Sequence, residues 1–435
     1  MEGAIEEQVI TKIMTYQDKK SEKVRSKLKV SRGTSFLCFS FFFVLGICNF
    51  LPITFFAAAN NFWLSKFANT TNPDAPRTRL QVNFASSVAI TGTVSSLILG
   101  IFNITIAHRF KIVSRIFICL ILELLVFMIL AISAVVNTDN VQLLYFIGVL
   151  FAYGVLSGEN TVNLLASAKL YVRFPRKYMK TCLLGQSTGG VIGDILNIIS
   201  VAIFKDLVKS TLLYFIIACV AISLTMMLFG LLLRSEFFKE SLESIPENVD
   251  KKMHSIQELR HLLYKIKYPT IILLYFMLTT EITHTSVTSL IVSEQHEDKT
   301  IWAENYFSPV MTFLLSDTFQ LLGRLYLTFY SFHMPEKVFY VVGSIRMALL
   351  VPFIWMCNAQ PRHHLPVLFS HDYQYGIIIA VFMFTSGILI NWSVLLVPKL
   401  VEKHETDIAY TVYTFAMNIC DIFIAPLGIL VVNVI

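Results

Sequence analysis

The sequence predicts an all-α polytopic membrane protein with eleven transmembrane helices. Hydrophobic residues make up 55% of the 435 residues, charged residues make up only 15%, and the mean hydropathy is +0.65. A soluble domain carries roughly 25% charged residues, so this chain has too little polar material to cover a globule in water. Its apolar residues also gather in repeated runs of about 20, the length that a helix needs to cross a bilayer. The lipid bilayer is therefore the predicted surrounding of most of the chain.

Eleven apolar runs define the predicted spans. Four of them contain no charged residue and are the clearest: 33–65, 80–107, 210–233 and 373–398. Seven more carry one or two internal charges: 116–136, 142–168, 181–204, 269–293, 306–330, 338–357 and 408–434. Because the total is odd, the two ends of the chain are expected on opposite sides of the membrane.

The basic residues of the loops predict the orientation. On the side of the N-terminus the loops carry 26 Lys and Arg residues, and on the other side they carry 7. Cytoplasmic loops retain basic residues, so we expect a cytoplasmic N-terminus and an extracellular C-terminus, with residence in the plasma membrane. Asn69 begins a glycosylation sequon on the predicted outer side, whereas the sequons at Asn103 and Asn391 fall inside spans. A glycan is therefore predicted at Asn69.

The span pattern divides the chain into four parts. They are a cytoplasmic N-terminal segment (1–33), a six-helix N-terminal bundle (34–233), a cytoplasmic central loop (234–268) and a five-helix C-terminal bundle (269–435). Within the central loop, Ser255 and Glu258 have the spacing of a capping box. The residues that follow place four apolar side chains on one face: Leu259, Leu262, Leu263 and Ile266. We expect a short amphipathic helix on the inner membrane surface, with a solvated linker as the alternative.

Sequence motifs argue against several other functions. The nucleotide-binding pattern GxxxxGK followed by Ser or Thr does not occur, and the seven cysteines form no CxxC pair or cluster with histidines. The run from Gly185 to Gly189 matches the GxSxG pattern of a nucleophile elbow, but it opens an apolar helix rather than joining a strand to a helix. Gly185, Gly189 and Gly193 instead form a stripe that favours close helix packing. We expect no cofactor, no metal, no nucleic acid, no obligate protein partner and no enzymatic activity.

Several ionisable residues lie inside the predicted spans, where a charge costs at least about 2.5–3.5 kcal/mol. They are Glu123, Glu159, Asp194, Glu281, Asp317, Arg324, Arg346 and Asp421, with His284 nearby. This number is high for a bundle that is held together by packing alone. It indicates a polar pathway or paired sites within the membrane.

The eighth predicted span is the most informative of these segments. Asp317, Gln320 and Arg324 are separated by three and four residues, which places them on one helical face. Such a row offers hydrogen-bond acceptors and donors to a polar ligand. A structural ion pair from Arg324 to Asp317 or to another helix is an equally weighted interpretation, and both can hold. Arg115 is interpreted first as a cytoplasmic anchor, and Gln186 as a packing partner or a ligand contact.

Several motifs resemble those of the equilibrative nucleoside transporter family. The first span is similar at Phe50-Leu51-Pro52 and Phe55-Phe56, and the fifth at Phe174-Pro175, Tyr178-Met179 and Gly185-Gln186. The eighth is similar at Leu322-Gly323-Arg324. The ninth and its exit are similar at Arg346, Val351-Pro352-Phe353, Cys357-Asn358 and Pro361-Arg362, and the tenth ends similarly with Pro398-Lys399.

The resemblance implies a major-facilitator-like arrangement of six plus five helices, with the substrate near the midplane between the two bundles. It further implies that the expected contacts or gates are Ile53, Thr54, Arg115, Gln186, Asp317, Gln320 and Arg324. In this chain Ile53 stands where the family usually has a tryptophan, and Thr54 replaces an asparagine. Gln320 stands at the usual aspartate position, and Asp317 would substitute for that acid one turn earlier. Asn160 and Asn163 are the candidates for the polar contact of the fourth span.

The implied function is facilitative transport of nucleosides or nucleobases by alternating access. A nucleoside suits the eighth-span face, because ribose hydroxyls need donors and acceptors. The alternative within the family is an organic-cation or proton-coupled transporter, which the surplus of intramembrane acids motivates. A channel, a receptor or a membrane-embedded enzyme is less consistent with the sequence. A receptor would be expected to have seven spans, and an enzyme would be expected to show paired catalytic groups.

Overall fold

The computed structural model is helical throughout its described part, apart from two isolated backbone bridges between loops. It describes residues 31–69, 78–106, 110–203, 206–243, 256–285, 287–298, 300–329, 336–360, 362, 364–402 and 405–434. Almost all of the predicted N-terminal segment therefore lies outside the described residues. So do Thr70 and Thr71 of the sequon, Ser255 of the expected capping box, and the side chains of Glu281 and Asp421.

The first predicted span folds as three consecutive helices: α2 (Arg32–Cys48), α3 (Leu51–Ala58) and α4 (Asn60–Lys66). α2 begins where the backbone N–H of Thr34 donates to Ser31 Oγ at 3.1 Å, which is an N-cap. The helix is interrupted just before Pro52, because proline lacks an N–H and disfavours helical geometry in the residue before it. The interruption places Ile53 and Thr54 on a separate short helix.

The next five predicted spans are continuous helices: α5 (Arg79–Thr105), α6 (Ile112–Val135), α7 (Gln142–Val172), α8 (Arg176–Ile203) and α9 (Leu207–Leu232). A single 3₁₀ turn, η2 (Asp139–Val141), precedes α7. Thr78 and Gln81 form a reciprocal capping box at the start of α5, and Asp206 caps α9 through the backbone N–H of Val208. These caps explain why the helices begin where the apolar runs begin.

The C-terminal half contains more interruptions. Its elements are α12 (Lys267–Thr280), η3 (Glu281–Thr285), η4 (Thr288–Leu290), η5 (Trp302–Tyr306), η6 (Ser308–Leu314), α13 (Leu315–Phe329), α14 (Glu336–Ile345), η7 (Arg346–Leu350), α15 (Val351–Trp355), α16 (Asp372–Leu400) and α17 (Thr406–Val434). η3, η5, η6 and η7 are π-helical turns, in which the backbone is wider than in an α-helix. Pro309 lies within η6, and Pro352 is the second residue of α15, the helix that follows η7. A missing proline N–H frees a carbonyl one turn earlier, so irregular turns are expected there.

Six helices in the described part are long and apolar enough to cross a membrane by themselves. The number is seven if α12 and the preceding helix α11 (Ile256–Lys265), which meet at a bend of 77°, are one broken span. The protein is therefore a multi-pass helical membrane protein. Helical structure coincides with each of the eleven predicted spans, but several are assembled from shorter pieces, and the count of eleven stays a prediction.

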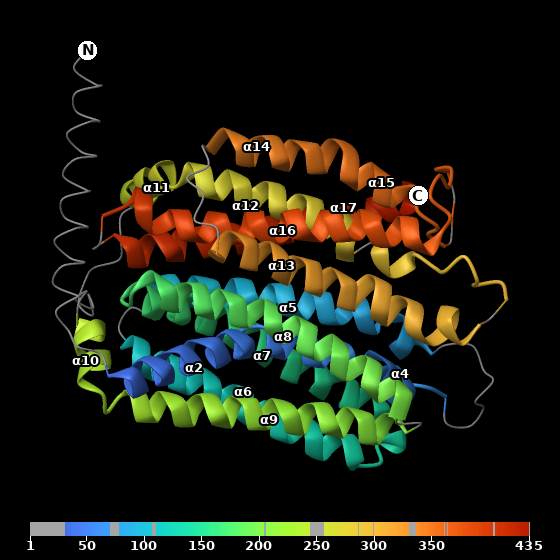
Figure 1. Ribbon diagram of the computed structural model, residues 1–435. Helices are drawn as coiled ribbons and strands as arrows, with labels where there is room; N and C mark the ends of the chain where they lie inside the picture. The colour runs from blue at the N-terminus through green and yellow to red at the C-terminus, as the bar shows by residue number, and fades with distance from the viewer. Residues whose placement is uncertain are drawn as a thin grey trace.

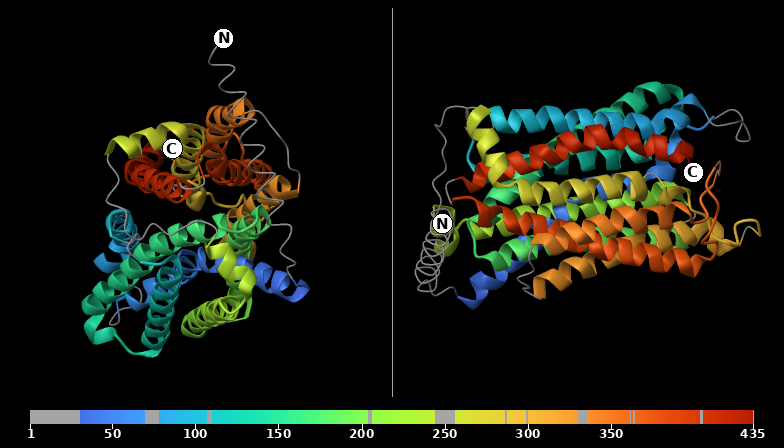
Figure 2. Two further views of the ribbon diagram at one scale, coloured as in Figure 1. Left: turned by 90° about the vertical axis from the view of Figure 1, so that its left-hand side faces the viewer. Right: turned by 90° about the horizontal axis from the view of Figure 1, so that it is seen from above.

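The helices run side by side in one elongated bundle that consists of two halves (Figures 1 and 2). In the N-terminal half α2 packs on α8 and α9, while α7 packs on α5 and α6. In the C-terminal half α16 packs on α12 and α13, while α17 packs on α12. The halves meet along two seams, one where α8 contacts η6 and α13, and one where α17 contacts α5 and α7.

The expected amphipathic helix of the central loop is present as α11, near the same end of the bundle as α10 (Glu236–Glu243) (Figure 1). Leu262 and Ile266 are buried, but Leu263 is exposed, so only part of the predicted apolar face is covered by protein. α11 packs against α17 and α12, and Lys265 Nζ lies 2.9 Å from Glu405 Oε1. This ion pair fixes α11 to the start of α17.

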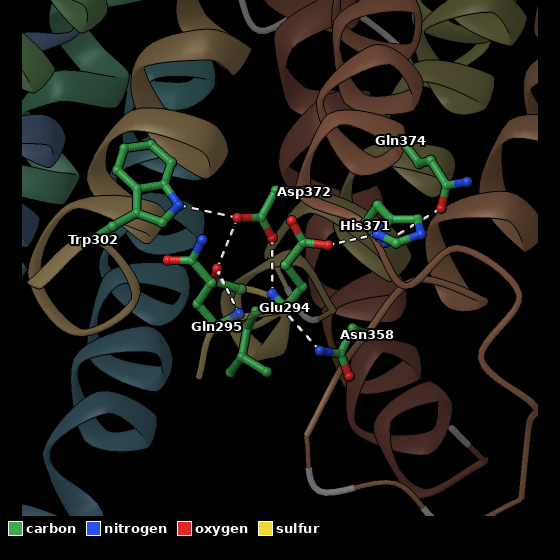
Figure 3. Close-up of polar contacts among 9 residues, drawn as sticks. Glu294, Gln295, Trp302, Asn358, His371, Asp372 and Gln374 are labelled. Carbon is green, nitrogen blue, oxygen red and sulfur yellow. Dashed lines mark hydrogen bonds and ion pairs between the residues drawn. The ribbon is translucent and has the colours of Figure 1, made fainter. Parts of the chain in front are cut away.

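At the opposite end, the loops before η5 and before α16 are joined by a polar cluster (Figure 3). Asp372, the first residue of α16, accepts hydrogen bonds from Ser293 Oγ at 2.7 Å and from Trp302 Nε1 at 3.0 Å. Glu294 donates its backbone N–H to the same carboxylate, and its own carboxylate lies 2.5 Å from His371 Nδ1. The cluster connects the beginnings of η5 and α16, and so fixes how the eighth and tenth predicted spans emerge at this end.

Candidate functional site

α8 carries the predicted glycine stripe, and the stripe faces the first helices of the chain. A Cβ atom at Gly185 would overlap the carbonyl of Phe43 on α2, and Gly189 packs at van der Waals distance against Ile47 of the same helix. Gly193 lies against the methyl group of Thr54 on α3. The structure thus confirms the interpretation of the stripe as a helix-packing surface, and the GxSxG run lies inside α8 rather than at a strand-to-helix turn.

Another face of α8 points towards α13 and carries polar groups. Arg324 on α13 is only 8% exposed, and its Nη1 donates to the backbone carbonyl of Leu183 at 3.0 Å. The same nitrogen donates to Gln186 Oε1 at 3.4 Å. Two of the predicted site residues, Gln186 and Arg324, therefore meet across the seam between the halves.

Asp317 lies two turns before Arg324 and faces α8 at Gly190. A Cβ atom at Gly190 would overlap Asp317 Oδ2, so the carboxylate occupies the space that the missing side chain leaves. Because Leu183 lies opposite Arg324 and Gly190 lies opposite Asp317, α8 and α13 run antiparallel here. Asp194 follows Gly190 by one turn on the same face of α8, and its carboxylate interacts electrostatically with that of Asp317.

A direct ion pair between Asp317 and Arg324, which was one interpretation of the sequence, does not form within 4 Å among the described residues. The two residues share a face, but seven residues of α-helix separate them by about 10 Å along the axis. Their charges still attract each other through the protein. Arg324 uses its hydrogen bonds to hold α8 instead.

The first-span residues lie beside this cluster. Thr54 touches Gly193, the neighbour of Asp194, and its hydroxyl donates to the carbonyl of Phe50 at 3.1 Å. Ile53 is 42% exposed, so it leaves apolar surface on α3 uncovered by other side chains. Gln320 is half-buried on α13, where its backbone carbonyl contacts Gly387 of α16.

Three further predicted residues lie within the N-terminal half. Arg115 is buried at the start of α6 and donates to Asn103 Oδ1 on α5 at 3.0 Å. Asn160 and Asn163 are buried on α7, a helix that packs against both α3 and α8. In the described part of the chain, the amide oxygen of Asn160 and both amide atoms of Asn163 have no hydrogen-bond partner. The predicted glycosylation residue, Asn69, is exposed after α4.

Asp194 was noted in the sequence only as an intramembrane acid and was not placed in the predicted site. A signal for it exists, since Gln186, Gly190 and Asp194 recur every four residues and so share a helical face. What the sequence does not indicate is that this face meets the Asp317–Arg324 row of α13.

Taken together, the seam between α8 and α13 presents acids, an amide and a guanidinium within a membrane-embedded bundle. Such a set offers both acceptors and donors to a polar, uncharged solute. Since α8 belongs to one half and α13 to the other, movement of the halves would open or close this group of side chains.

Comparison with solved structures identifies the fold. The chain is similar to the Escherichia coli fucose:proton symporter, with a TM-score of 0.57 and 12% identity, covering 92% of each chain. It is also similar to the xylose symporter of the major facilitator superfamily, with a TM-score of 0.55 and 13% identity, covering 90% of this chain and 86% of that one. At such low identity these likenesses show the fold alone, which is that of a major-facilitator transporter.

Comparison of sequences identifies the family. Residues 167–420, more than half of the chain, match the family model described as nucleoside transporter. Equilibrative nucleoside transporter 3 of Rattus norvegicus is 23% identical over 405 residues, covering 87% of this chain and 85% of that protein. Equilibrative nucleoside transporter 1 of Homo sapiens is 24% identical over 428 residues, covering 86% and 92%. The chain therefore belongs to the equilibrative nucleoside transporter family.

Proposed function

We propose that this protein equilibrates nucleosides across its membrane by alternating access, without coupling to an energy source. The observation that carries the proposal is the seam between α8 and α13, where Gln186 and Leu183 of one half bind Arg324 of the other. A solute that binds there contacts both halves, so rocking of the halves about it exposes the solute to each side in turn. Family membership supports a nucleoside over an organic cation as that solute.

The proposed topology is the one the sequence predicts. It has eleven spans, six in the bundle 34–233 and five in the bundle 269–435, with the segment 1–33 and the loop 234–268 in the cytoplasm. The basic loops support a cytoplasmic N-terminus and a C-terminus on the opposite side of the membrane; we place the protein in the plasma membrane, so that the C-terminus is extracellular. In support of an odd number of crossings, α2 begins and α17 finishes at opposite ends of the bundle (Figure 1).

The proposed site consists of residues from both halves. Arg324, Gln186, Asp317 and Gln320 supply hydrogen-bonding groups along the seam, and the exposed side chain of Ile53 supplies an apolar surface for the base. Thr54 fixes α3 against α8 beside them. Three residues of the N-terminal half extend the polar lining or act as gates: Arg115, Asn160 and Asn163.

The test is uptake by liposomes that contain the purified protein, with labelled uridine, adenosine, uracil and an organic cation as separate probes. We expect uridine and adenosine to equilibrate in both directions without ATP, at rates that an imposed pH gradient does not change. Unlabelled uridine inside the vesicles should accelerate entry of labelled uridine. The variant Glu240→Gln, in the exposed turn of α10, is the control for handling of the protein. Uptake of the cation alone, or accumulation of uridine above its external concentration, would refute the proposal.

A further inference from the structure

Asp194 is an acidic residue of α8 that is not among the residues of the proposed site. It lies on the face of α8 that meets α13, one turn beyond the glycine against which Asp317 rests. The two carboxylates are thus neighbours that belong to different halves of the molecule, and they interact electrostatically. Neither is sealed in a core, because both side chains are half-buried and keep some accessible surface.

The charges and hydrogen bonds of this group are incomplete. Two acids, Asp194 and Asp317, are neighbours, whereas the guanidinium of Arg324 lies about two helical turns from Asp317. Asp194 Oδ2 is shielded from solvent and accepts no hydrogen bond from any described residue, and Arg324 Nε likewise has no acceptor in the described structure. A shielded polar atom without a partner is costly. The group therefore lacks one donor for the carboxylate and one acceptor for the guanidinium.

A hydroxyl group supplies the donor that the Asp194 carboxylate lacks, since it donates one hydrogen bond and accepts others. Two hydroxyls on adjacent carbons fit better still, because each can donate to one of the two carboxylates. The ribose ring of a nucleoside carries such a pair at its 2′ and 3′ positions, whereas a free nucleobase has none. Hydrogen bonds to ionised groups are also roughly twice as strong as neutral ones.

We propose that Asp194 is a further substrate-binding residue, which together with Asp317 accepts hydrogen bonds from the 2′- and 3′-hydroxyls of a ribonucleoside. This inference rests on the proposed nucleoside transport and specifies the substrate class within it. The carboxylate pair selects ribonucleosides over dideoxynucleosides and over free nucleobases. A site built to bind a hydroxyl discriminates strongly against an analogue that lacks it, because its buried polar groups are then left unpaired.

The test measures how well unlabelled uridine, 2′,3′-dideoxyuridine and uracil inhibit exchange of labelled uridine by the full-length protein in liposomes. For the unaltered protein we expect uridine to inhibit at concentrations at least about tenfold lower than the other two, the size of a lost hydrogen bond to a charged group. In Asp194→Ala the inhibition constant for uridine should rise about tenfold, while that for dideoxyuridine stays the same. Asp194→Asn, which keeps one acceptor, should fall between them.

The variant Glu240→Ala is the control, because its side chain is exposed on α10. A purely structural role of Asp194 would lower the amount of protein or shift all three inhibition constants alike, and either result would overturn the inference. Equal inhibition by uridine and dideoxyuridine in the unaltered protein would overturn it too, while leaving nucleoside transport intact. Competition by an organic cation that disappears in Asp194→Ala would show that the acids bind positive charge instead. Absence of any nucleoside exchange would refute the proposed function itself.

Discussion

Two buried arginines of this bundle are bound by neutral groups, Arg346 within one half of the molecule and Arg324 across the two halves. Arg346 is fully buried, yet its guanidinium donates to the carbonyl of Phe382, to Thr385 Oγ1 at 2.8 Å and to Thr279 Oγ1 at 3.2 Å. It also stacks on the Phe382 ring, 4.0 Å from the centroid. Neutral groups on α12 and α16 thus bind both terminal nitrogens of this cation, as carbonyl dipoles and an aromatic face can do, while its Nε has no acceptor in the described structure. Arg324 is held similarly, by a carbonyl and an amide, but its contacts cross between the halves.

Because the contacts of Arg324 cross between the halves, we expect a substitution there to affect transport more than folding. Arg324→Lys keeps the charge but cannot supply the planar fork of donors. We expect uridine uptake to fall at least tenfold, roughly the loss of one hydrogen bond to a charged group, with near-normal protein abundance. Initial uptake rates, normalised to protein at the cell surface, measure it. Arg260→Lys, at an exposed position of α11, is the matched control, and full activity of Arg324→Lys would reduce Arg324 to a simple positive charge.

Glu123 on α6 and Glu159 on α7 show the opposite situation. Both are buried, their charges interact, and none of their four carboxylate oxygens has a hydrogen-bond partner within the described ranges. Glu123→Gln removes a charge while keeping the shape of the side chain. We expect thermal stability in detergent to stay the same or to rise, by up to about 3 kcal/mol, because the amide removes one of two like charges that share a buried site.

Thermal unfolding followed by intrinsic fluorescence measures this effect, with Glu240→Gln as the exposed control. A clear loss of stability in Glu123→Gln would mean that the carboxylate has a stabilising partner. In that case the carboxylates of Glu123 and Glu159 have hydrogen-bonding partners and stabilise the fold instead of destabilising it.

At the scale of elements, helix contacts in this protein depend on reciprocal small residues. Gly323 of α13 lies on the carbonyl of Phe384 and on Gly387 of α16, while Gly387 lies on the carbonyl of Gln320. A Cβ atom at either position would overlap backbone rather than a movable side chain. The contact brings α13 and α16 unusually close, and it sets the rotation of α13 that points Asp317 and Arg324 at α8.

This contact predicts that one added methyl group at Gly323 affects both stability and transport. Gly323→Ala should destabilise the protein by about 1–3 kcal/mol, the usual cost of overpacking, and should reduce transport by turning α13. Thermal unfolding and uridine uptake check it. Gly230→Ala, on α9, is the control, because a Cβ atom there meets no other atom within 4 Å. If both variants behave alike, the α13–α16 contact is more adaptable than the structure indicates.

At the scale of the whole molecule, two contacts between the halves lie at the predicted cytoplasmic end. Lys180 Nζ, near the start of α8, donates to the carbonyl of Thr328 in the last turn of α13 at 2.8 Å. Tyr171 near the end of α7 meets Tyr410 near the start of α17 edge-on, with ring centroids 6.2 Å apart. Opening towards the cytoplasm would have to break these contacts, so they belong to the mechanism proposed for alternating access.

Glycosylation tests the orientation in which this end of the bundle is cytoplasmic. Because Asn69 is exposed on the predicted outer side, synthesis in eukaryotic microsomes should add one glycan, and Asn69→Gln should abolish the mass shift. Asn391→Gln is the control, since Asn391 is buried and donates to the carbonyl of Arg324 at 3.3 Å. A shift that survives Asn69→Gln would reverse the assigned topology.

The sequence alone determined the helical fold class, the positions of the apolar runs, the packing role of the glycine stripe and the row of polar residues on α13. These are local properties, because hydropathy and the helical period can be counted over a few turns. Even there, the breaks at Pro52 and at the π-helical turns were missed, since they depend on how neighbouring helices satisfy the freed backbone groups.

Only the tertiary structure decided what the row on α13 faces. Arg324 binds Leu183 and Gln186, some 140 positions earlier in the chain, instead of Asp317 on its own helix. Asp194 joins the site because Gly190 lets α13 approach α8. A helical face has no partner until the bundle packs, and the rotation of each helix is set by contacts of small residues far apart in sequence. For that reason the polar row on α13 could be named from the sequence, but the residues that it faces on α8 could not.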